Sequence, residues 1–266
     1  MFNIDEYFAR IGFVHRESED RTQQFIRLHR CHSLAVPFED FNPFCGLAVS
    51  LDIQDIFEKV VRDRRGGYCF ELNRLFQELL HALGYQSRPV LCRPFSGEGE
   101  RLPLTHRLSI VPLDGQLWVA DVGLGGNGWV EPLLLKPGLE QIQFGRTYRI
   151  REDSESGYVV ELKREDVFVE AAAFGLHYAE ESDFEMSNYY TSSYPGSPFV
   201  TRMMCTLPAF EGRYTIRDNL FKIEQGGRTS ETLLKAGTVQ NVLETYFGVV
   251  LTADMNAYIC DYLERA

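Results

Sequence analysis

The sequence lacks the features by which several large classes of protein are identified. It contains no run of lysine and arginine, and its formal net charge is −11, so it offers no basic track for a nucleic-acid backbone. No stretch is apolar for long enough to cross a membrane, and the first residues are acidic rather than basic, so no signal peptide is expected. Internal repeats and low-complexity tracts are also absent. We therefore expect a partner that is neither nucleic acid nor membrane, and the oligomeric state stays open.

The cysteines also lack a pattern. None of the six lies in a C-x-x-C pair, so a zinc site or a thioredoxin-type redox pair has no support. Unpatterned cysteines are typical of reducing cytoplasm, and we predict a cytoplasmic protein with free thiols and no metal. The composition is that of an ordinary globular protein, with 44% hydrophobic and 24% charged residues in a chain of 266.

Two kinds of hydrophobic periodicity divide the chain. Up to residue 84, helical spacing predicts helices over 2–11, 22–36, 53–61 and 69–83. Beyond residue 84, alternation predicts an antiparallel sheet or small barrel with strands over 88–93, 104–111, 116–122, 147–151, 158–162 and 167–171. A polar loop is predicted over 187–198, followed by strands at 199–206, 214–217 and 220–224. Helices are predicted with a cap at Ser230, over 238–247 and from 252 onward, which completes an α+β fold.

One cysteine stands at the junction of a glycine turn and a helix. Residues 64–73 read Arg-Arg-Gly-Gly-Tyr-Cys-Phe-Glu-Leu-Asn, and the apolar positions that follow have helical spacing. We therefore expect Cys69 in the first turn of a buried helix. Unpaired N–H groups and the positive end of the helix dipole lie there, and both stabilise a thiolate. A nucleophilic cysteine is one interpretation, and an inert buried thiol is the other.

A base and its orienting carboxylate are predicted on one hairpin. If Asp114-Gly115 is a two-residue turn, His106 and Asp121 lie on the same face as diagonal neighbours, about 7 Å apart at the backbone. His81 lies twelve residues after Cys69 on one helix, which is about 18 Å along the axis and too far to serve as the base. The chain thus offers a Cys-His-Asp arrangement, which proteases, thioesterases and acyltransferases all use.

Several stretches resemble the arylamine N-acetyltransferases. They are V-P-F-E at 36–39, R-G-G-Y-C-F-E-L-N at 65–73, T-H-R-L at 105–108 and V-A-D-V-G at 119–123, in the family's order and spacing. The resemblance implies a helical bundle over 1–84, an antiparallel β-barrel over 85–190 and an α/β lid over 191–266, around a cysteine-protease-like catalytic core. It implies that Cys69, His106 and Asp121 form the catalytic triad.

The resemblance also implies the chemistry. Acetyl-CoA would acetylate Cys69, and an aromatic amine or hydrazine would then take the acetyl group in a ping-pong reaction. Phe38, Phe70 and Phe199 match positions that line the substrate pocket, although residues of this type also build ordinary cores. Glu39 and Arg64 resemble a supporting ion pair, for which a solvated surface pair is the alternative.

Two positions depart from the family pattern. Leu124 stands where the family usually has an aromatic residue, and we expect it to alter the preference for acceptors and to line the pocket. Asp40 stands where the family usually has asparagine. The glycine-rich run at 123–128 lacks the Lys-Ser/Thr ending of a P-loop, so we expect a flexible loop at the site mouth. Its N–H groups could touch CoA, but which residues contact CoA stays open.

Three other functions stay open at this stage. An amide synthase of the same family would use a larger biosynthetic acyl donor than acetyl-CoA. A cysteine hydrolase would release free acid without any amine. A binding module would keep Cys69 as an inert core thiol.

Overall fold

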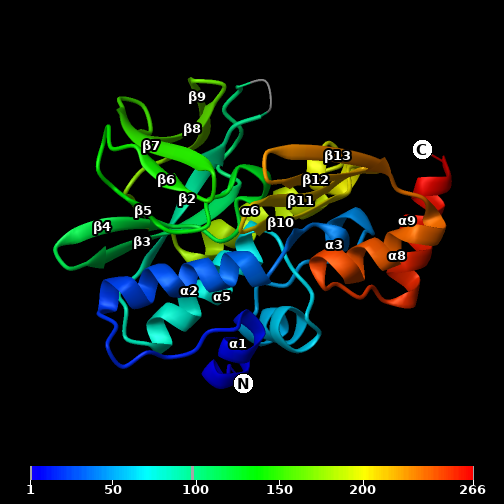
Figure 1. Ribbon diagram of the computed structural model, residues 1–266, viewed down its shortest axis with the longest axis horizontal. Helices are drawn as coiled ribbons and strands as arrows, with labels where there is room; N and C mark the ends of the chain where they lie inside the picture. The colour runs from blue at the N-terminus through cyan, green and yellow to red at the C-terminus, as the bar shows by residue number, and fades with distance from the viewer. Residues whose placement is uncertain (1, 97–98, 266) are drawn as a thin grey trace.

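The computed structural model describes residues 2–96 and 99–265. Three groups of elements are seen in Figure 1: blue and cyan helices, a green sheet, and a yellow and orange sheet with red helices beside it. The helices of the first group are α1 (Ile4–Ile11), α2 (Arg21–Ala35), α3 (Phe41–Phe44), α4 (Ile53–Phe57) and α5 (Cys69–Ala82). These elements confirm the helical first third that the sequence predicts.

Local signals explain where these helices begin and end. Asn3 accepts hydrogen bonds from the first N–H groups of α1, and Gly12 ends that helix with a left-handed φ of 64°. Asp20 and Gln23 form a capping box at the start of α2. A π-helical turn, Glu58–Arg62, continues α4. The apolar face of α5 is fully buried and makes this helix the centre of the helical group.

The larger sheet has eight antiparallel strands in the order β5-β4-β3-β2-β9-β8-β7-β6. Their bounds are β2 (Arg88–Pro94), β3 (His106–Leu113), β4 (Gln116–Ala120), β5 (Leu133–Leu134), β6 (Gln141–Gln143), β7 (Arg146–Asp153), β8 (Gly157–Arg164) and β9 (Val167–Phe174). The predicted strands of this region are confirmed. Inward side chains such as Val90, Ile110 and Trp129 form one buried cluster inside the sheet.

Two glutamine side chains bring the outer strands of this sheet together. The amide of Gln141 on β6 both accepts from the N–H and donates to the carbonyl of Leu134 on β5. Gln143 accepts from the N–H groups of Val130 and Glu131 and donates to the carbonyl of Glu131. Side chains thereby replace the backbone ladder at the seam, and the sheet becomes a nearly closed barrel.

The smaller sheet joins the two ends of the chain. It has the order β1-β10-β11-β12-β13, and β1 (Phe38–Glu39) comes from the helical part. The other strands are β10 (Met204–Ala209), β11 (Gly212–Arg217), β12 (Leu220–Gln225) and β13 (Arg228–Leu233). Against it pack α8 (Ala236–Val242), a π-helical turn (Leu243–Phe247) and α9 (Ala253–Arg265). The segment with β1 therefore belongs structurally to both the first and the last thirds of the chain.

Three sequence predictions in the last third are wrong. Most of the predicted loop at 187–198 is instead the end of helix α6 (Glu181–Ser193). Polar side chains of this helix form hydrogen bonds inside the protein; Asn188, for example, accepts one from Tyr68. The predicted strand over 199–206 begins only at Met204 and is preceded by α7 (Pro198–Thr201). The predicted helix at Ser230 is instead strand β13, an exposed strand at the edge of the smaller sheet. Its extended conformation is set by backbone pairing with β12 rather than by a local sequence pattern.

Whether the segments 1–84, 85–190 and 191–266 behave as separate domains stays a prediction. No helix within the described ranges is both long and apolar enough to cross a membrane.

Replacing Gln143 by leucine should weaken the barrel seam. The variant leaves the N–H groups of Val130 and Glu131 without their acceptor, and one such buried loss costs about 1–3 kcal/mol of unfolding free energy. Chemical denaturation measures this loss. Ile142→Ala is the matched control, because this neighbouring side chain is 79% exposed and its removal should change little. Equal unfolding free energies for the Gln143→Leu variant and the unaltered protein would show that the seam is not closed in solution.

Candidate active site

Two glycines allow the chain to place Cys69 at the start of α5. A Cβ on Gly66 would lie 2.1 Å from the carbonyl oxygen of Pro37, and one on Gly67 would lie 2.9 Å from a carboxylate oxygen of Glu71. Side chains at these positions are therefore excluded by close packing. Cys69 is the first residue of α5 and only 2% exposed, as the sequence predicts.

A buried ionic cluster fixes this turn. Arg65 donates to Glu39 at 2.7 Å, and Lys59 binds Glu71 at 2.8 Å and Glu39 at 3.7 Å. Glu71 also accepts from the N–H of Tyr68, directly before the cysteine. Burial opposes the charge on Glu39, but Arg65 and Lys59 hold the pKa of Glu39 below its ordinary value.

The predicted pair of Glu39 with Arg64 is therefore wrong by one residue. Arg64 adopts a left-handed φ of 55°, and its side chain is exposed. This conformation turns the chain so that Arg65, not Arg64, enters the interior. Neighbouring arginines cannot be told apart by sequence when a backbone turn decides which of them is buried.

The hairpin of β3 and β4 brings His106 and Asp121 together. The register is the predicted one, with Leu113 opposite Gln116 across the Asp114-Gly115 turn. Nε2 of His106 lies 2.6 Å from Oδ2 of Asp121, and both residues are buried. The sequence prediction of this contact is confirmed.

The second oxygen of Asp121 is held by two further donors. Oδ1 accepts from Nδ2 of Asn73 at 2.8 Å and from the N–H of Gly123 at 2.8 Å. Burial alone would raise the pKa of Asp121, but His106 and these donors hold it below its ordinary value. Asn73 also accepts from the N–H of Val122 and so ties α5 to the segment after β4.

Cys69 meets the imidazole at the same place. Its Sγ lies 3.7 Å from the carbonyl oxygen of Thr105, the residue before His106, and is close enough to the imidazole to act on its charge. Burial opposes a charged imidazole, but the negative charges of Asp121 and Cys69 outweigh it and raise the pKa of His106 to about 10. The structure thus brings the three residues of the predicted Cys-His-Asp arrangement into contact.

Sequence reasoning missed two residues of this network. Asn73 was not singled out, although it lies one helical turn after Cys69 and therefore on the same face of α5. His29, on α2, was not assigned to the site either. Its Nε2 accepts from the backbone N–H of Asp121 at 3.0 Å, and its Nδ1 lies 2.8 Å from the carbonyl oxygen of Val130. Because a carbonyl only accepts, the hydrogen is on Nδ1 and the imidazole is neutral.

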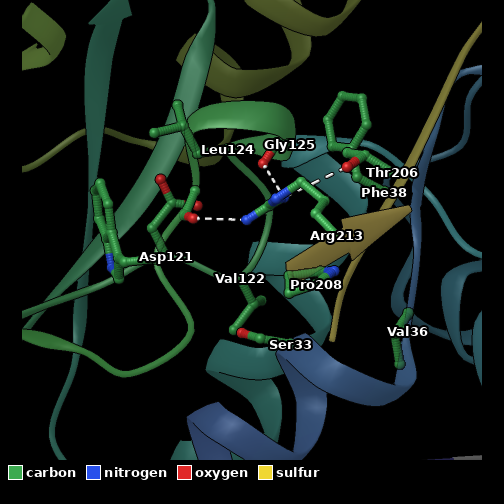
Figure 2. Close-up of a pocket in the computed structure, with 12 residues that line it drawn as sticks. Ser33, Val36, Phe38, Asp121, Val122, Leu124, Gly125, Thr206, Pro208 and Arg213 are labelled. Atoms are coloured by element: carbon green, nitrogen blue, oxygen red, sulfur yellow. Dashed lines mark hydrogen bonds between the residues drawn. The ribbon is translucent and has the colours of Figure 1, made fainter. Parts of the chain in front are cut away.

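The predicted pocket residues divide into two groups. Phe38 and Leu124 line a small cavity of about 20 Å³ beside Asp121 (Figure 2). The ring of Phe199 packs against Phe38. Phe70 is fully buried and packs against Tyr68 in the helical core. Their roles in substrate binding stay predictions.

Asp40, the departure from the family's asparagine, is a buried carboxyl group. Its Oδ1 accepts from the N–H of Met204 at 2.8 Å, and its Oδ2 has no partner among the described residues. Burial raises the pKa of Asp40 well above its ordinary value and so favours the neutral form of this carboxyl group.

No group of three or more His, Cys, Asp or Glu side chains in residues 2–96 and 99–265 is placed to hold a metal ion.

Comparisons with known proteins agree on one family. A family model described as N-acetyltransferase matches residues 22–256. The arylamine N-acetyltransferase of Escherichia coli (strain K12) is 29% identical over 264 residues, which cover 98% of this chain and 93% of that protein. The enzyme of that name from Mycobacterium tuberculosis (strain H37Rv) is 31% identical over 255 residues, covering 93% and 89%.

Solved structures give the same result. An arylamine N-acetyltransferase from Salmonella typhimurium has a TM-score of 0.90 and 25% identity, covering 99% of this chain and 98% of that chain. The Mycobacterium marinum enzyme in complex with CoA has a TM-score of 0.91 and 26% identity, with 99% of each chain covered. The predicted resemblance and fold class are confirmed.

His29 should make the protein less stable in acid. Burial lowers the pKa of His29 from 6.5 to about 4, so between these pH values the unfolded chain binds a proton that the folded protein does not, and lowering the pH favours unfolding. The whole window corresponds to about 3 kcal/mol. His29→Gln cannot titrate, so we expect the stability difference between the two proteins to shrink from pH 7.5 to pH 4.5.

Urea denaturation at several pH values measures this difference. Burial also lowers the pKa of His32, but His32 is present in both proteins, so its contribution cancels from the difference in unfolding free energy. A difference that stays constant with pH would show that His29 protonates normally in the folded protein.

Proposed function

This chain belongs to the arylamine N-acetyltransferase family, and we propose that it moves an acetyl group from acetyl-CoA to the nitrogen of an arylamine or arylhydrazine through a thioester on Cys69. The observation that supports this most is the contact of Cys69, His106 and Asp121 in one buried site. Each of the three then has a role: nucleophile, proton carrier and orienting carboxylate.

In the first half-reaction the sulfur of Cys69 attacks the acetyl carbonyl carbon. His106, whose pKa is raised to about 10, is placed to take the proton of the thiol as the sulfur attacks. When the tetrahedral intermediate collapses, the bond between the carbonyl carbon and the CoA sulfur breaks, and the imidazolium gives its proton to that sulfur. CoA leaves as a thiol, and a neutral imidazole faces an acetylated Cys69.

In the second half-reaction the neutral imidazole acts as a base. Acetylation removes the charge of Cys69, which is one of the two charges that raise the pKa of His106, so this pKa falls after the first step. The amine nitrogen attacks the thioester, His106 takes its proton, and the bond from carbon to the Cys69 sulfur breaks. The sulfur leaves as a thiolate beside an imidazolium, which restores the starting state.

The oxyanion of each tetrahedral intermediate is expected at the start of α5. The first N–H groups of a helix have no acceptor within that helix, and Cys69 is the first residue of α5. Donors of this kind are aimed at developing negative charge and supply a large part of the rate enhancement in acyl transfer.

The acceptor site is proposed around Phe38, Leu124 and Phe199. The aromatic rings of Phe38 and Phe199 are in contact, and Leu124 lies across the small cavity from Phe38. An aryl ring suits such an apolar surface, and an aromatic amine arrives uncharged, as attack on a thioester requires. Because position 124 is leucine rather than an aromatic residue, this side of the proposed acceptor site offers no ring on which an aryl substrate could stack.

Brief mixing with acetyl-CoA should add one acetyl group to the protein. We expect intact-protein mass spectrometry to show this adduct in the unaltered protein, to show none in Cys69→Ser, and to show its loss when an arylamine is added. Cys31→Ser is the control, because Cys31 is a half-buried free cysteine on α2. Loading by a larger acyl-CoA but not by acetyl-CoA would instead indicate an amide synthase, and rapid release of acetate without amine would indicate a hydrolase.

Replacing Asp121 by asparagine should lower acetyl transfer by about a hundredfold or more. The variant removes the charge that holds the imidazolium and lowers the pKa of His106. Asp40→Asn is the matched control, since it makes the same change at another buried carboxyl group, whose pKa burial raises. Steady-state rates of both variants, with circular dichroism to check folding, test this role. Full activity in Asp121→Asn would remove Asp121 from the mechanism.

A further inference from the structure

Helix α6 contacts the chain on both sides of Cys69. Asn188 of this helix accepts a hydrogen bond from the hydroxyl of Tyr68, the residue directly before the cysteine. The ring of Phe184 lies edge to face with the ring of Phe70, the residue directly after the cysteine, with 6.4 Å between the ring centroids. All four side chains are buried, so both contacts lie inside the protein. One helix thus packs against both sequence neighbours of the nucleophile.

The same helix also contacts the chain on both sides of His106. Ser187 donates to the carbonyl oxygen of Leu104, two residues before the histidine, at 2.9 Å. Arg107, directly after the histidine, donates to both carboxylate oxygens of Glu181 at 3.0 and 3.1 Å. The side chain of Arg107 is fully buried, and a carboxylate is the partner that a buried cation needs. Helix α6 therefore binds the neighbours of the base as well as those of the nucleophile.

The amide of Asn188 can make its contact with Tyr68 in one orientation only. Its Nδ2 donates to the carbonyl oxygen of Val49 at 3.1 Å. Because a carbonyl oxygen only accepts, the amide nitrogen has to face Val49, and the amide oxygen is left for the hydroxyl of Tyr68. An apolar side chain at position 188 would lose both hydrogen bonds.

Contacts between different parts of the fold set the distance from the sulfur of Cys69 to the imidazole of His106, because these residues come from α5 and β3. Asn73 ties α5 to the hairpin through its hydrogen bond to Asp121. A further contact away from this bond resists rotation of the two elements about it. Helix α6 supplies such a contact, since it binds the sequence neighbours of both Cys69 and His106.

We propose that α6 holds the sulfur of Cys69 within reach of the imidazole of His106, and that the hydrogen bond between Asn188 and Tyr68 is its principal contact for this role. Asn188 and Tyr68 are positioning residues, because they act through Cys69. The proposal rests on the proposed function, since it takes Cys69 as the nucleophile and His106 as the base. Proton transfer between the two needs a contact of hydrogen-bond length, and a displacement of about 1 Å can cost about a hundredfold in rate.

The pH at which Cys69 becomes reactive reports this distance. A thiol next to an imidazolium loses its proton more readily, so separation of the two groups should move alkylation of Cys69 to higher pH. The two groups are coupled in this structure, since the charge of Cys69 is one of the charges that raise the pKa of His106.

The test compares Tyr68→Phe, Asn188→Leu and the double variant with the unaltered protein. Tyr68→Phe removes one hydroxyl group and keeps the buried ring, including its packing against Phe199 of the proposed acceptor wall. Tyr189→Phe is the matched control, because it removes the same group from a side chain on α6 that is 75% exposed. Circular dichroism checks folding, and Tyr68→Phe alone decides the test where Asn188→Leu is unfolded.

Alkylation of Cys69 by iodoacetamide is measured against pH, with peptide mass spectrometry to separate Cys69 from the other cysteines. We expect the half-maximal pH to rise by about one pH unit in each single variant, so that Cys69 reacts about tenfold more slowly at pH 7. The double variant should equal the single variants, because all of them remove the same contact. The control should match the unaltered protein.

Three results would overturn the proposal: an unchanged pH profile in Tyr68→Phe, a shift of the same size in Tyr189→Phe, or effects of Tyr68→Phe and Asn188→Leu that add in the double variant. The first would show that the contact does not position the sulfur. The second would show that the shift does not depend on the contact, and the third that the two residues act separately.

Iodoacetamide needs neither an acetyl donor nor an amine, so this test is independent of the proposed donor reaction. A pH profile that depends on Tyr68 and Asn188, in a protein that acetyl-CoA does not load, would overturn the proposed reaction and support the positioning role. Full loading of Cys69 by acetyl-CoA in all the variants, with an unchanged pH profile, would overturn the positioning role and leave the proposed reaction standing.

Discussion

The carboxylate of Asp121 is the interaction on which the rest of the site depends. It is fully buried, and a buried charge is tolerated only when each oxygen has partners. Those partners come from different parts of the chain: Asn73 from α5, His106 from β3 and the N–H of Gly123 from the segment after β4. Satisfying this one charge requires the helical group and the barrel to dock, so assembly of the fold and assembly of the site are the same event.

A second constraint holds the helical group to the smaller sheet. Strand β1 pairs with β10, and the carboxylate of Glu39 on β1 binds Arg65 just before the glycine turn. Arg65 also reaches Met255 on α9. The turn that carries the nucleophile is therefore fixed from three sides. Inside such a buried site charges interact strongly, and we propose that loss of the charge on Cys69 by acetylation therefore lowers the proton affinity of His106.

Sequence patterns predicted the parts of the site that local rules control. The glycine turn and helix start placed Cys69, and a two-residue turn with period-two alternation placed His106 beside Asp121. Where contacts between residues far apart in the sequence determine the structure, the sequence predictions were wrong or missing. The polar helix α6 looked like a loop because its polar residues find partners such as Tyr68, far away in sequence. The edge strand β13 is exposed along its whole length, so its sequence shows no alternation of buried and exposed residues. At Arg64, a left-handed backbone turn decides that Arg65 rather than Arg64 is buried, and sequence alone does not reveal such a turn.

The two proposed substrates are selected by different physics. A neutral aromatic amine carries no charge for the acidic surface to attract or repel, so we propose that its binding depends on the apolar wall of Phe38 and Phe199. A CoA thioester carries several negative charges, and most of this protein's surface repels it because the net charge is −11. Local positive charge, such as that of Arg146, Lys163 and Arg217 between the barrel and the smaller sheet, attracts anions in such a field. On the proposed function, an apolar wall therefore selects the acceptor and local positive charge attracts the donor.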